Sequence, residues 1–221
     1  GGNATDSARG YCCSGTLGAL VTNGTAQYIL SNAHVFAHDI FPPDIAEEGD
    51  PIDQPGLVDV KCGDRPKDYV ANLSAWAPVD GTANVDAAIA EVVPGAVDPD
   101  GRILEIGTIA ATPVAASLNQ KVKKSGRTTG LTSSYVTEIN ATVTVVYTNE
   151  CGGGTFTKKF EGQIFVDNEI VVHKRSTYFL AAGDSGSLMV EDVDVNPAPV
   201  GLLFAGSPSV AVANPIGDVL G

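Results

Sequence analysis

Short runs of apolar and β-branched residues recur along the whole chain, and turn residues bound each of them. Such runs predict β-strands. They occupy residues 17–21, 28–30, 58–60, 69–73, 87–93, 135–139, 143–147, 163–166, 170–172, 188–190 and 200–204. Segments long enough for amphipathic helices are scarce. Many short strands joined by glycine-rich turns are typical of an all-β sandwich or barrel.

The length of the chain limits how these strands can be grouped. With 221 residues, 43% of them hydrophobic, it can bury one large core or two small ones. Residues 110–116 form an extended segment of small side chains, so we expect a linker over residues 110–118. The sequence therefore predicts two antiparallel six-stranded β-barrels, an N-terminal one over residues 1–109 and a C-terminal one over residues 119–221.

Three local signals refine this outline. Asn23-Gly24 lies between two strand runs and predicts a tight hairpin, since both residues tolerate positive φ. The stretch 42–56 is acidic and proline-rich, which indicates a solvated excursion. Asn214-Pro215 offers an N-cap followed by proline at the first helical position, and it predicts a short C-terminal helix.

The balance of charge argues against two classes of partner. With 26 acidic and 13 basic residues the formal net charge is −13, which repels nucleic-acid phosphates and anionic membranes. The sequence also lacks the run of about 18 apolar residues that a membrane span needs. A peptide or small-molecule partner is favoured.

Four cysteines are too few for a disulfide-held miniprotein, and they lack the C-x-x-C pairs of a zinc site. Cys12 and Cys13 are adjacent while Cys62 and Cys151 stand alone, so zero to two disulfides are open. The chain begins with two glycines and no methionine, so we expect a processed product or an excised part of a longer chain. Secreted and intracellular locations both stay open.

The segment 183–187, G-D-S-G-S, is the strongest local signal for chemistry. A serine between glycines on a tight turn exposes its Oγ, and neighbouring backbone N–H groups converge where an oxyanion would form. The alternative is an ordinary turn between strands. The nucleophile elbow of α/β-hydrolases is excluded, because it needs a histidine downstream and none follows Ser185.

An apolar strand over residues 28–33 runs into His34, which places the imidazole at a strand end, where it can face a cleft. Of the three histidines, His34 is the candidate general base. The alternative is a partly buried structural histidine. His38 is expected at the surface. His173 is expected in packing or at the surface, and the alternative is that it lines the substrate cleft.

Asp86 stands at the head of the apolar run 87–93. Burying a carboxylate costs several kcal/mol unless a donor hydrogen-bonds it, and an imidazole N–H would do so. The alternative is a solvated turn aspartate. His34 and Asp86 fall in the first half of the chain and Ser185 in the second, which places the candidate site in the cleft between the two barrels.

In this order the motifs resemble those of a two-barrel, chymotrypsin-like (trypsin-fold) serine peptidase, and the match covers most of the chain. The segment 31–34, S-N-A-H, is similar to T-A-A-H and T-N-x-H, 86–90 to D-I-A-L, and 183–187 to G-D-S-G-G. Residues 13–17 resemble the strand before the catalytic histidine, 125–132 the hairpin that opens the second barrel, and 201–206 the strand G-I-V-S-W-G that walls the primary pocket.

The resemblance implies a role for each site residue. Ser185 is the nucleophile, His34 the general base, and Asp86 the group that fixes the imidazole tautomer. The backbone N–H groups of Gly183 and Ser185 form the oxyanion hole. The reaction implied is endopeptidase cleavage through an acyl-enzyme, which needs no metal and no organic cofactor.

Departures from the family pattern carry information as well. Val35 replaces the cysteine that follows the histidine in animal trypsins, and Ser187 replaces the second glycine after the nucleophile, as in many bacterial members. Bacterial trypsin-like peptidases are therefore the expected relatives. The residues 1–3 do not resemble the apolar N-terminus that pairs with the aspartate before the nucleophile, so Asp184 needs another partner.

The resemblance also implies a substrate pocket. It places Phe179, six residues before Ser185, at the base of the pocket, and Phe204, Ala205 and Gly206 along its wall. No carboxylate stands at the base to pair with a lysine or arginine side chain, which disfavours tryptic cleavage. If the two phenylalanines fill the pocket, the P1 residue must be small to medium and apolar, or the pocket is closed.

Two other functions remain open. One is a catalytically silent trypsin-fold domain that binds peptides by strand addition along residues 201–206. The other is a purely structural two-barrel domain of a larger chain. The partner expected for the peptidase is a peptide or protein substrate, and contacts with other domains of a longer chain stay open.

Overall fold

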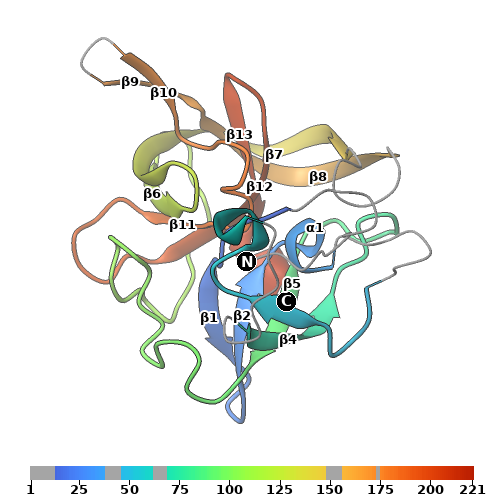
Figure 1. The fold of residues 1–221 in the computed structure, drawn as a ribbon. Coiled ribbons are helices and arrows are strands. Elements are labelled where there is room, and N and C mark those ends of the chain that lie inside the picture. Colours follow the sequence, from blue (N-terminus) through green and yellow to red (C-terminus); the bar gives the residue numbers. More distant parts are fainter. Residues whose placement is uncertain (1–12, 38–45, 62–68, 148–155, 173–174) are drawn as a thin grey trace.

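The computed structural model describes residues 13–37, 46–61, 69–147, 156–172 and 175–221. Within these ranges the chain forms strands β1 to β13 and two short α-helices. Strands make up most of the regular structure, as Figure 1 shows, which confirms the predicted all-β fold.

The strands of the N-terminal half form one five-stranded antiparallel sheet, in the order β1-β2-β5-β4-β3. Its members are β1 (Ala19–Thr22), β2 (Gln27–Ser31), β3 (Pro51–Asp53), β4 (Tyr69–Trp76) and β5 (Ala88–Val92). The predicted hairpin joins β1 to β2, with Thr22 opposite Gln27. Gly24 in its turn has φ +91°, a conformation that glycine adopts without steric cost.

Strands of the C-terminal half close into a barrel, in the order β11-β12-β13-β8-β7-β6. Its members are β6 (Lys121–Gly126), β7 (Gly130–Tyr147), β8 (Phe156–Asp167), β11 (Leu188–Glu191), β12 (Pro199–Gly206) and β13 (Val210–Pro215). Two further strands, β9 (Glu169–Val172) and β10 (Arg175–Tyr178), pair as a hairpin that projects from the barrel (Figure 1). The six-stranded barrel predicted for this half is confirmed.

The all-β, two-barrel fold predicted for the chain is confirmed, and within the described residues the strands of the N-terminal half form a five-stranded sheet with β1 and β3 at its edges. The acidic stretch 42–56 is more than a solvated excursion. Its residues Pro51–Asp53 form β3, and Ile52 is completely buried. The strand expected at residues 58–60 is instead part of a 3-10 helix, Leu57–Val60. Such short segments show too few alternations for a period to reveal them.

The short C-terminal helix is present as α2 (Ile216–Leu220), but its start differs from the prediction. Pro215 occupies the N-cap position, and Asn214 belongs to β13. The Asn214 side chain instead accepts a hydrogen bond from the backbone N–H of Asp86, 128 residues away in sequence. A tertiary contact has replaced the local cap.

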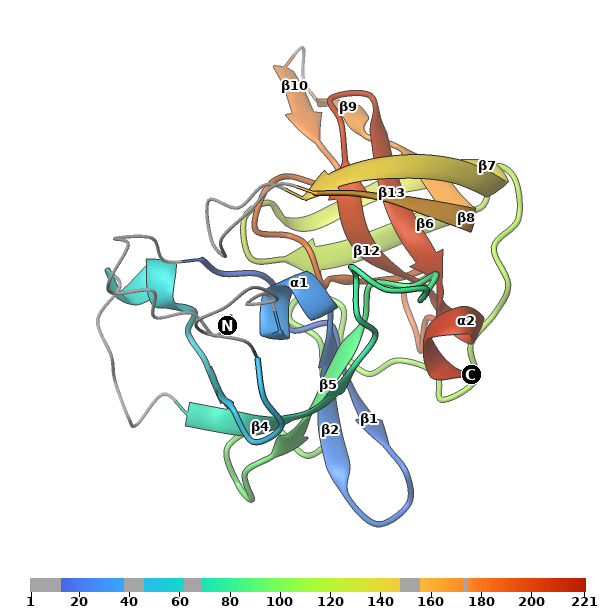
Figure 2. The same cartoon turned by 90° about the vertical axis from the view of Figure 1, so that its right-hand side faces the viewer.

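The two halves share buried apolar contacts. One hydrophobic cluster fills the N-terminal sheet and another fills the barrel. A third cluster joins them, since it contains Leu30 of β2 together with Leu188 of β11 and Leu202 of β12. Helix α1 (Ala33–Phe36), which follows β2, lies where the sheet meets the barrel (Figure 2). The limits of the two predicted domains and of the linker at residues 110–118 stay a prediction.

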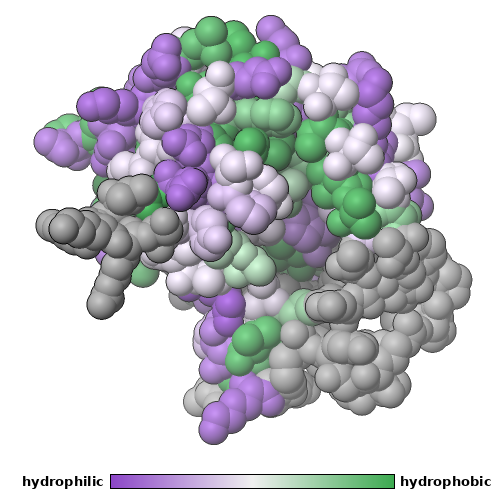
Figure 3. Space-filling view, turned by 90° about the horizontal axis from the view of Figure 1, so that it is seen from above, coloured by the Kyte–Doolittle hydropathy of each residue, from purple (hydrophilic) through white to green (hydrophobic). Residues whose placement is uncertain are grey.

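The outer face of the barrel is mixed in character. Along β7, exposed side chains largely alternate with half-buried ones. Seen from above, hydrophobic and hydrophilic side chains are interspersed over this face of the molecule (Figure 3). None of the helices in the described ranges is long and apolar enough to cross a membrane.

Candidate active site

His34 and Asp86 lie in direct contact. His34 sits in α1, and Asp86 lies two residues before β5. The His34 Nδ1 atom is 2.6 Å from Asp86 Oδ2, and the backbone N–H of His34 donates to Asp86 Oδ1 over 3.1 Å. The second contact fixes the carboxylate relative to the start of the helix, so the ring and the acid are held as one unit.

The Asp86 carboxyl is completely buried, whereas a quarter of the His34 side chain is exposed. Burial alone would raise the pKa of Asp86. The charge of His34, the hydrogen bond from its ring, a hydrogen bond from Tyr147 and the His34 backbone N–H outweigh the burial and hold that pKa below its usual value. Asp86 is therefore ionised at neutral pH, as an acid that must stabilise an imidazolium requires.

Backbone contacts fix the segment that carries Asp86. Its N–H donates to Asn214 Oδ1 over 2.9 Å, and its carbonyl accepts from Asn32 Nδ2 over 2.7 Å. Asn214 in turn donates to Gln163 Oε1 over 2.6 Å. Because Asn214 and Gln163 belong to the barrel, the position of Asp86 depends on the docking of the two halves.

The turn 183–187 packs directly against the N-terminal half. The backbone N–H of Thr16 donates to the carbonyl of Ser185 over 2.8 Å, and the Thr16 hydroxyl donates to the carbonyl of Gly183 over 2.9 Å. Gly15 allows this approach, since a Cβ there would lie 2.5 Å from the Val35 side chain and 3.0 Å from the Ser185 carbonyl. Ser185 is thereby brought beside the helix that carries His34.

The Ser185 side chain is half-buried, and its Oγ makes no hydrogen bond to any described residue. In particular, no hydrogen bond joins it to the His34 ring. Catalytic hydrogen bonds are often long in ligand-free structures and tighten when substrate binds. The structure thus brings together His34 and Asp86 by contact, and Ser185 with them by the packing of its turn.

The orientation of the peptide before Gly183 is fixed on both sides. The Ala182 carbonyl accepts from Thr128 Oγ1 over 2.7 Å, and a trans peptide bond points the following N–H, that of Gly183, the opposite way. Gly183 has φ +94°, where a Cβ would collide with Thr128 Oγ1 at 2.5 Å. The N–H groups of Gly183 and Ser185 donate to no described residue.

Asp184 finds its partner inside the barrel, as the sequence required. Its carboxylate is completely buried, and it accepts from the N–H groups of Thr128, Thr129 and Ala181 and from the Thr129 hydroxyl. Lys124 Nζ lies 3.5 Å from Asp184 Oδ2, and its side chain is also without exposure. The buried Lys124–Asp184 ion pair therefore anchors the turn that carries Ser185.

The expected pocket residues lie in different surroundings. Phe179 is completely buried in the barrel core, and Phe204 is almost completely buried in a second cluster with Phe160. Ala205 is half-buried and Gly206 is exposed at the end of β12. The side chain that faces Gly206 is Leu180, whose Cδ2 lies 3.1 Å from where a Cβ on Gly206 would stand.

The end of β12 offers an edge for an extended chain. Strand β11 pairs with β12 only from Pro199 to Leu202, and Leu203 then exchanges hydrogen bonds with the turn 186–187. On the opposite edge, β13 pairs with β12 as far as Gly206. The segment 204–206 therefore has one side without a strand neighbour in the described part of the chain.

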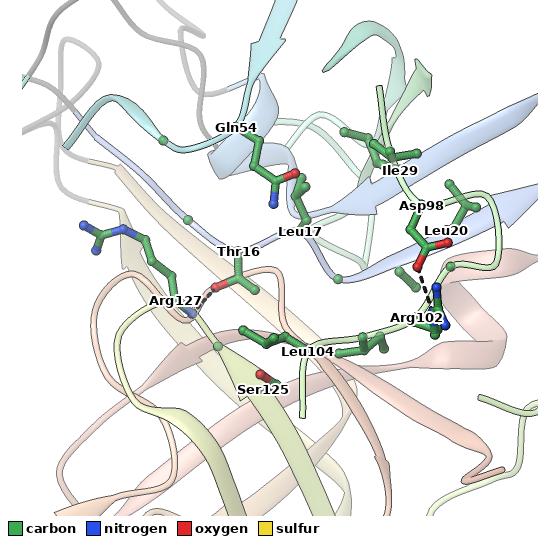
Figure 4. A pocket seen from close by; sticks show the side chains of 18 of the residues that line it. Thr16, Leu17, Leu20, Ile29, Gln54, Asp98, Arg102, Leu104, Ser125 and Arg127 are labelled. Carbon is green, nitrogen blue, oxygen red and sulfur yellow. Dashed lines mark hydrogen bonds and ion pairs between the residues drawn. The ribbon is translucent and has the colours of Figure 1, made fainter. Parts of the chain in front are cut away.

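A pocket of about 500 Å³ lies next to Thr16, which is one of its lining residues (Figure 4). Residues 15–20, 54–56, 96–98, 101–104 and 125–127 contribute to its lining. Figure 4 shows the Thr16 hydroxyl accepting from the Arg127 N–H at its rim. His34, Asp86 and Ser185 do not line this pocket, so it is separate from the candidate site.

Some residues at the site were not identified from the sequence. Lys124, Tyr147 and Leu180 belong to ordinary strand or turn patterns, and nothing local distinguishes them. His38 and His173 lie outside the described residues. Cys13 is disulfide-bonded, and the other three cysteines lie outside the described residues. No group of three or more potential metal ligands comes together in the described ranges.

Comparison with known proteins gives a likeness of structure. No protein-family profile matches the chain, and no curated protein sequence matches it. Among solved structures it is similar to a glutamic acid specific serine protease, with 20% identity, a TM-score of 0.58, and coverage of 95% of this chain and 92% of that one.

Two further structures give similar values. Thermobifida fusca Protease A shares 15% identity at a TM-score of 0.56, with 93% of this chain and 87% of that one covered. A Cellulomonas bogoriensis chymotrypsin shares 16% identity at a TM-score of 0.55, with coverage of 93% and 85%. At these identities the likeness establishes the fold. The chain has the chymotrypsin-like fold of these serine proteases, as the resemblance in its motifs predicted.

Proposed function

We propose that the chain is a serine endopeptidase whose catalytic residues are Ser185, His34 and Asp86. The observation that carries this proposal is the contact between a completely buried, ionised Asp86 and a partly exposed His34, beside the Ser185 turn. An imidazole held by a buried carboxylate and open to solvent on its other side is suited to accept a proton. The fold shared with serine proteases supports the same assignment.

In the proposed reaction, Ser185 Oγ attacks the scissile carbonyl carbon while its proton passes to His34 Nε2. The C–N bond then breaks, and the same proton goes to the leaving amine. Water hydrolyses the acyl-enzyme by the reverse proton path through His34. Asp86 holds the Nδ1 proton of the ring throughout and stabilises the imidazolium.

The N–H groups of Gly183 and Ser185 support an oxyanion hole. Neither donates to a described residue, and the Ala182 carbonyl is held away by Thr128. The open side of residues 204–206 supports binding of the substrate backbone as an added strand. With the backbone groups placed in this way, substrate binding would require little rearrangement of them.

A fluorophosphonate probe tests the proposal, because an activated serine displaces its fluoride and becomes phosphonylated. We expect one covalent adduct, located on Ser185 by peptide mass analysis, together with cleavage of denatured protein substrates. An unlabelled chain that still binds extended peptides would contradict the peptidase and support the catalytically silent binding domain. Labelling at another serine would show that the nucleophile is misassigned.

We expect the proposed activity to fall at high pH, because the Lys124–Asp184 ion pair requires a protonated lysine. Burial lowers the pKa of Lys124 below its usual value of 10.5, although the attraction of Asp184 opposes this. Rising pH therefore neutralises Lys124 before an exposed lysine, and the buried Asp184 loses its counter-charge. We expect the labelling rate of Ser185 to fall on the alkaline side. Lys124→Arg, whose guanidinium stays charged, should extend activity to higher pH.

The matched control is Lys121→Arg, an exposed position at the start of the same strand. It should leave the pH profile of labelling unchanged. Identical alkaline limbs in the wild type and in Lys124→Arg, with both proteins folded by circular dichroism, would show that the ion pair does not limit activity.

Leu180 is proposed to determine the P1 preference, because its side chain occupies the space beside Gly206. We expect the wild type to prefer small apolar P1 residues. Leu180→Ala should raise kcat/KM for leucine or phenylalanine at P1, relative to alanine, by about tenfold or more, since one methylene in a pocket is worth about 10- to 200-fold. A peptide library that varies P1 measures this ratio.

Leu118→Ala, the same change at an exposed position, is the control for Leu180→Ala. Because truncating buried Leu180 costs stability, Leu180→Val provides a milder variant with the same expected direction. An unchanged P1 profile in both Leu180 variants, or dominant wild-type cleavage after charged residues, would overturn this assignment.

A further inference from the structure

The hydroxyl of Tyr147 reaches the candidate catalytic acid from the opposite half of the molecule. Tyr147 is the last residue of β7 in the barrel. Its OH donates to Asp86 Oδ2 over 2.8 Å, the same oxygen that lies 2.6 Å from His34 Nδ1. One carboxylate oxygen thus receives two donors, one from each side of the cleft.

Aromatic neighbours hold the Tyr147 ring in place. The ring stacks on Phe156 with centroids 4.9 Å apart and planes 9° from parallel. It also meets the His34 ring edge to face, with centroids 5.7 Å apart and an interplanar angle of 62°. Edge-to-face contacts of this kind favour one ring orientation over others. The tyrosine therefore touches both members of the His34–Asp86 pair.

Tyr147 remains a hydrogen-bond donor at every pH at which the site could work. Burial, followed by the charge of Asp86 and the hydrogen bond to it, raises the pKa of Tyr147 far above its usual value. Among the described residues, the titratable groups that act on Asp86 are His34 and Tyr147. The phenol is thus a constant donor to Oδ2 beside the His34 Nδ1–H, while the proton that moves during the reaction is the one on His34 Nε2.

A donor that shares an acceptor oxygen changes what that oxygen can do. Hydrogen bonds to the charged form of a carboxylate stabilise it and reduce its basicity. The Tyr147 bond therefore keeps Asp86 from taking the Nδ1 proton, and it limits the negative charge that the carboxylate directs at the imidazolium. The first effect keeps the Nδ1 proton on the ring, and the second favours return of the proton that His34 takes from Ser185.

We propose that Tyr147 is a positioning residue of the catalytic system, which fixes the Asp86 carboxylate through its hydroxyl and the His34 ring through its aromatic edge. This inference rests on the proposed peptidase function. The docking of the two halves then has a direct role, because Asp86 comes from the N-terminal half and the Tyr147 ring from the barrel.

Tyr147→Phe tests the hydroxyl alone, since it keeps the ring and its contacts with His34 and Phe156. We expect kcat to fall by about 10- to 100-fold, the loss typical of a hydrogen bond to a charged group, with KM little changed. With one donor fewer, Asp86 stabilises the imidazolium more strongly. The acid limb of the pH–rate profile should therefore move to higher pH, by roughly half a unit to one unit.

Tyr135→Phe is the matched control. Tyr135 lies on the same strand, and its OH also donates to a carboxylate, that of Asp167 over 2.9 Å, but it is exposed and does not contact Asp86. This variant should leave kcat and the pH profile unchanged. If Tyr147→Phe lowers only the unfolding temperature, with the acid limb in place, the role of Tyr147 is structural and the inference is wrong.

A readout that needs no activity separates this inference from the proposed function. The titration midpoint of the His34 ring, followed by NMR in the two tyrosine variants and the wild type, should rise in Tyr147→Phe alone. A wild type that resists the fluorophosphonate contradicts the peptidase, while the midpoint still decides whether Tyr147 acts on the His34–Asp86 pair. Equal midpoints in all three proteins would overturn the inference.

Discussion

Ser185→Ala is expected to abolish peptide and ester hydrolysis while the protein stays folded. Loss of a triad member in comparable enzymes lowers kcat by about 10⁴- to 10⁶-fold. Ser185 Oγ makes no hydrogen bond to a described residue, so its removal leaves no partner among these residues unsatisfied. The backbone carbonyl of Ser185 keeps its bond from Thr16, which holds the turn in place. The large loss should therefore come from chemistry and not from unfolding.

The measurement is turnover of a peptide that the wild type cleaves, together with thermal unfolding of both proteins. Ser133→Ala, an exposed serine on β7, makes the same chemical change away from the site and should keep full activity. Near wild-type turnover of Ser185→Ala on any such peptide would remove Ser185 from the mechanism. Equal losses in both serine variants would point to a general effect on folding.

Much of the fold could be predicted because its signals are local. The Asn23-Gly24 turn sets its own hairpin through the positive φ that Gly24 adopts. Runs of apolar and β-branched residues mark barrel strands such as β11 and β12, and the turn 183–187 combines glycines with a serine. The contact between His34 and Asp86 was predictable for a related reason, because a carboxylate at the head of a buried strand requires a donor.

Features that depend on distant partners could not be predicted in this way. Tyr147 and Asp86 are 61 residues apart in sequence. An aromatic residue at the end of a strand gives no local signal that its hydroxyl contacts a distant carboxylate. The sequence predicted that Asn214 caps a helix, but its side chain accepts a hydrogen bond from the Asp86 N–H of the other half. In each case the residue type is compatible with a local role and with a contact across the two halves. Which of the two it adopts depends on how the halves dock.

Closure of the N-terminal half is the part of the two-barrel fold on which the strand runs carry the least information. Strand runs give the number and direction of strands, but closure requires that the two edge strands meet with matching tilt and stagger. Among the described strands of this half the edges are β1 and the three-residue β3. The length of an edge strand is set by the loops around it, and local periodicity does not report it.

Asp86→Asn is expected to lower kcat by roughly 10⁴-fold, as in other triads, although the change is nearly isosteric. The carboxylate accepts three hydrogen bonds, from the His34 N–H on Oδ1 and from His34 Nδ1 and Tyr147 OH on Oδ2. An asparagine amide has one acceptor oxygen and one donor group. In either orientation its NH₂ group therefore faces a donor.

If the amide oxygen takes the Oδ2 position, the NH₂ group opposes the His34 backbone N–H. If it takes the Oδ1 position, the NH₂ group faces the imidazole and selects the tautomer with the proton on Nε2, which cannot accept the Ser185 proton. Kinetics together with ¹⁵N NMR of the His34 ring distinguish these cases. Asp192→Asn, an exposed change, should be neutral. A fully active Asp86→Asn with an unchanged tautomer would mean that this buried carboxylate serves the packing of the two halves and not the chemistry.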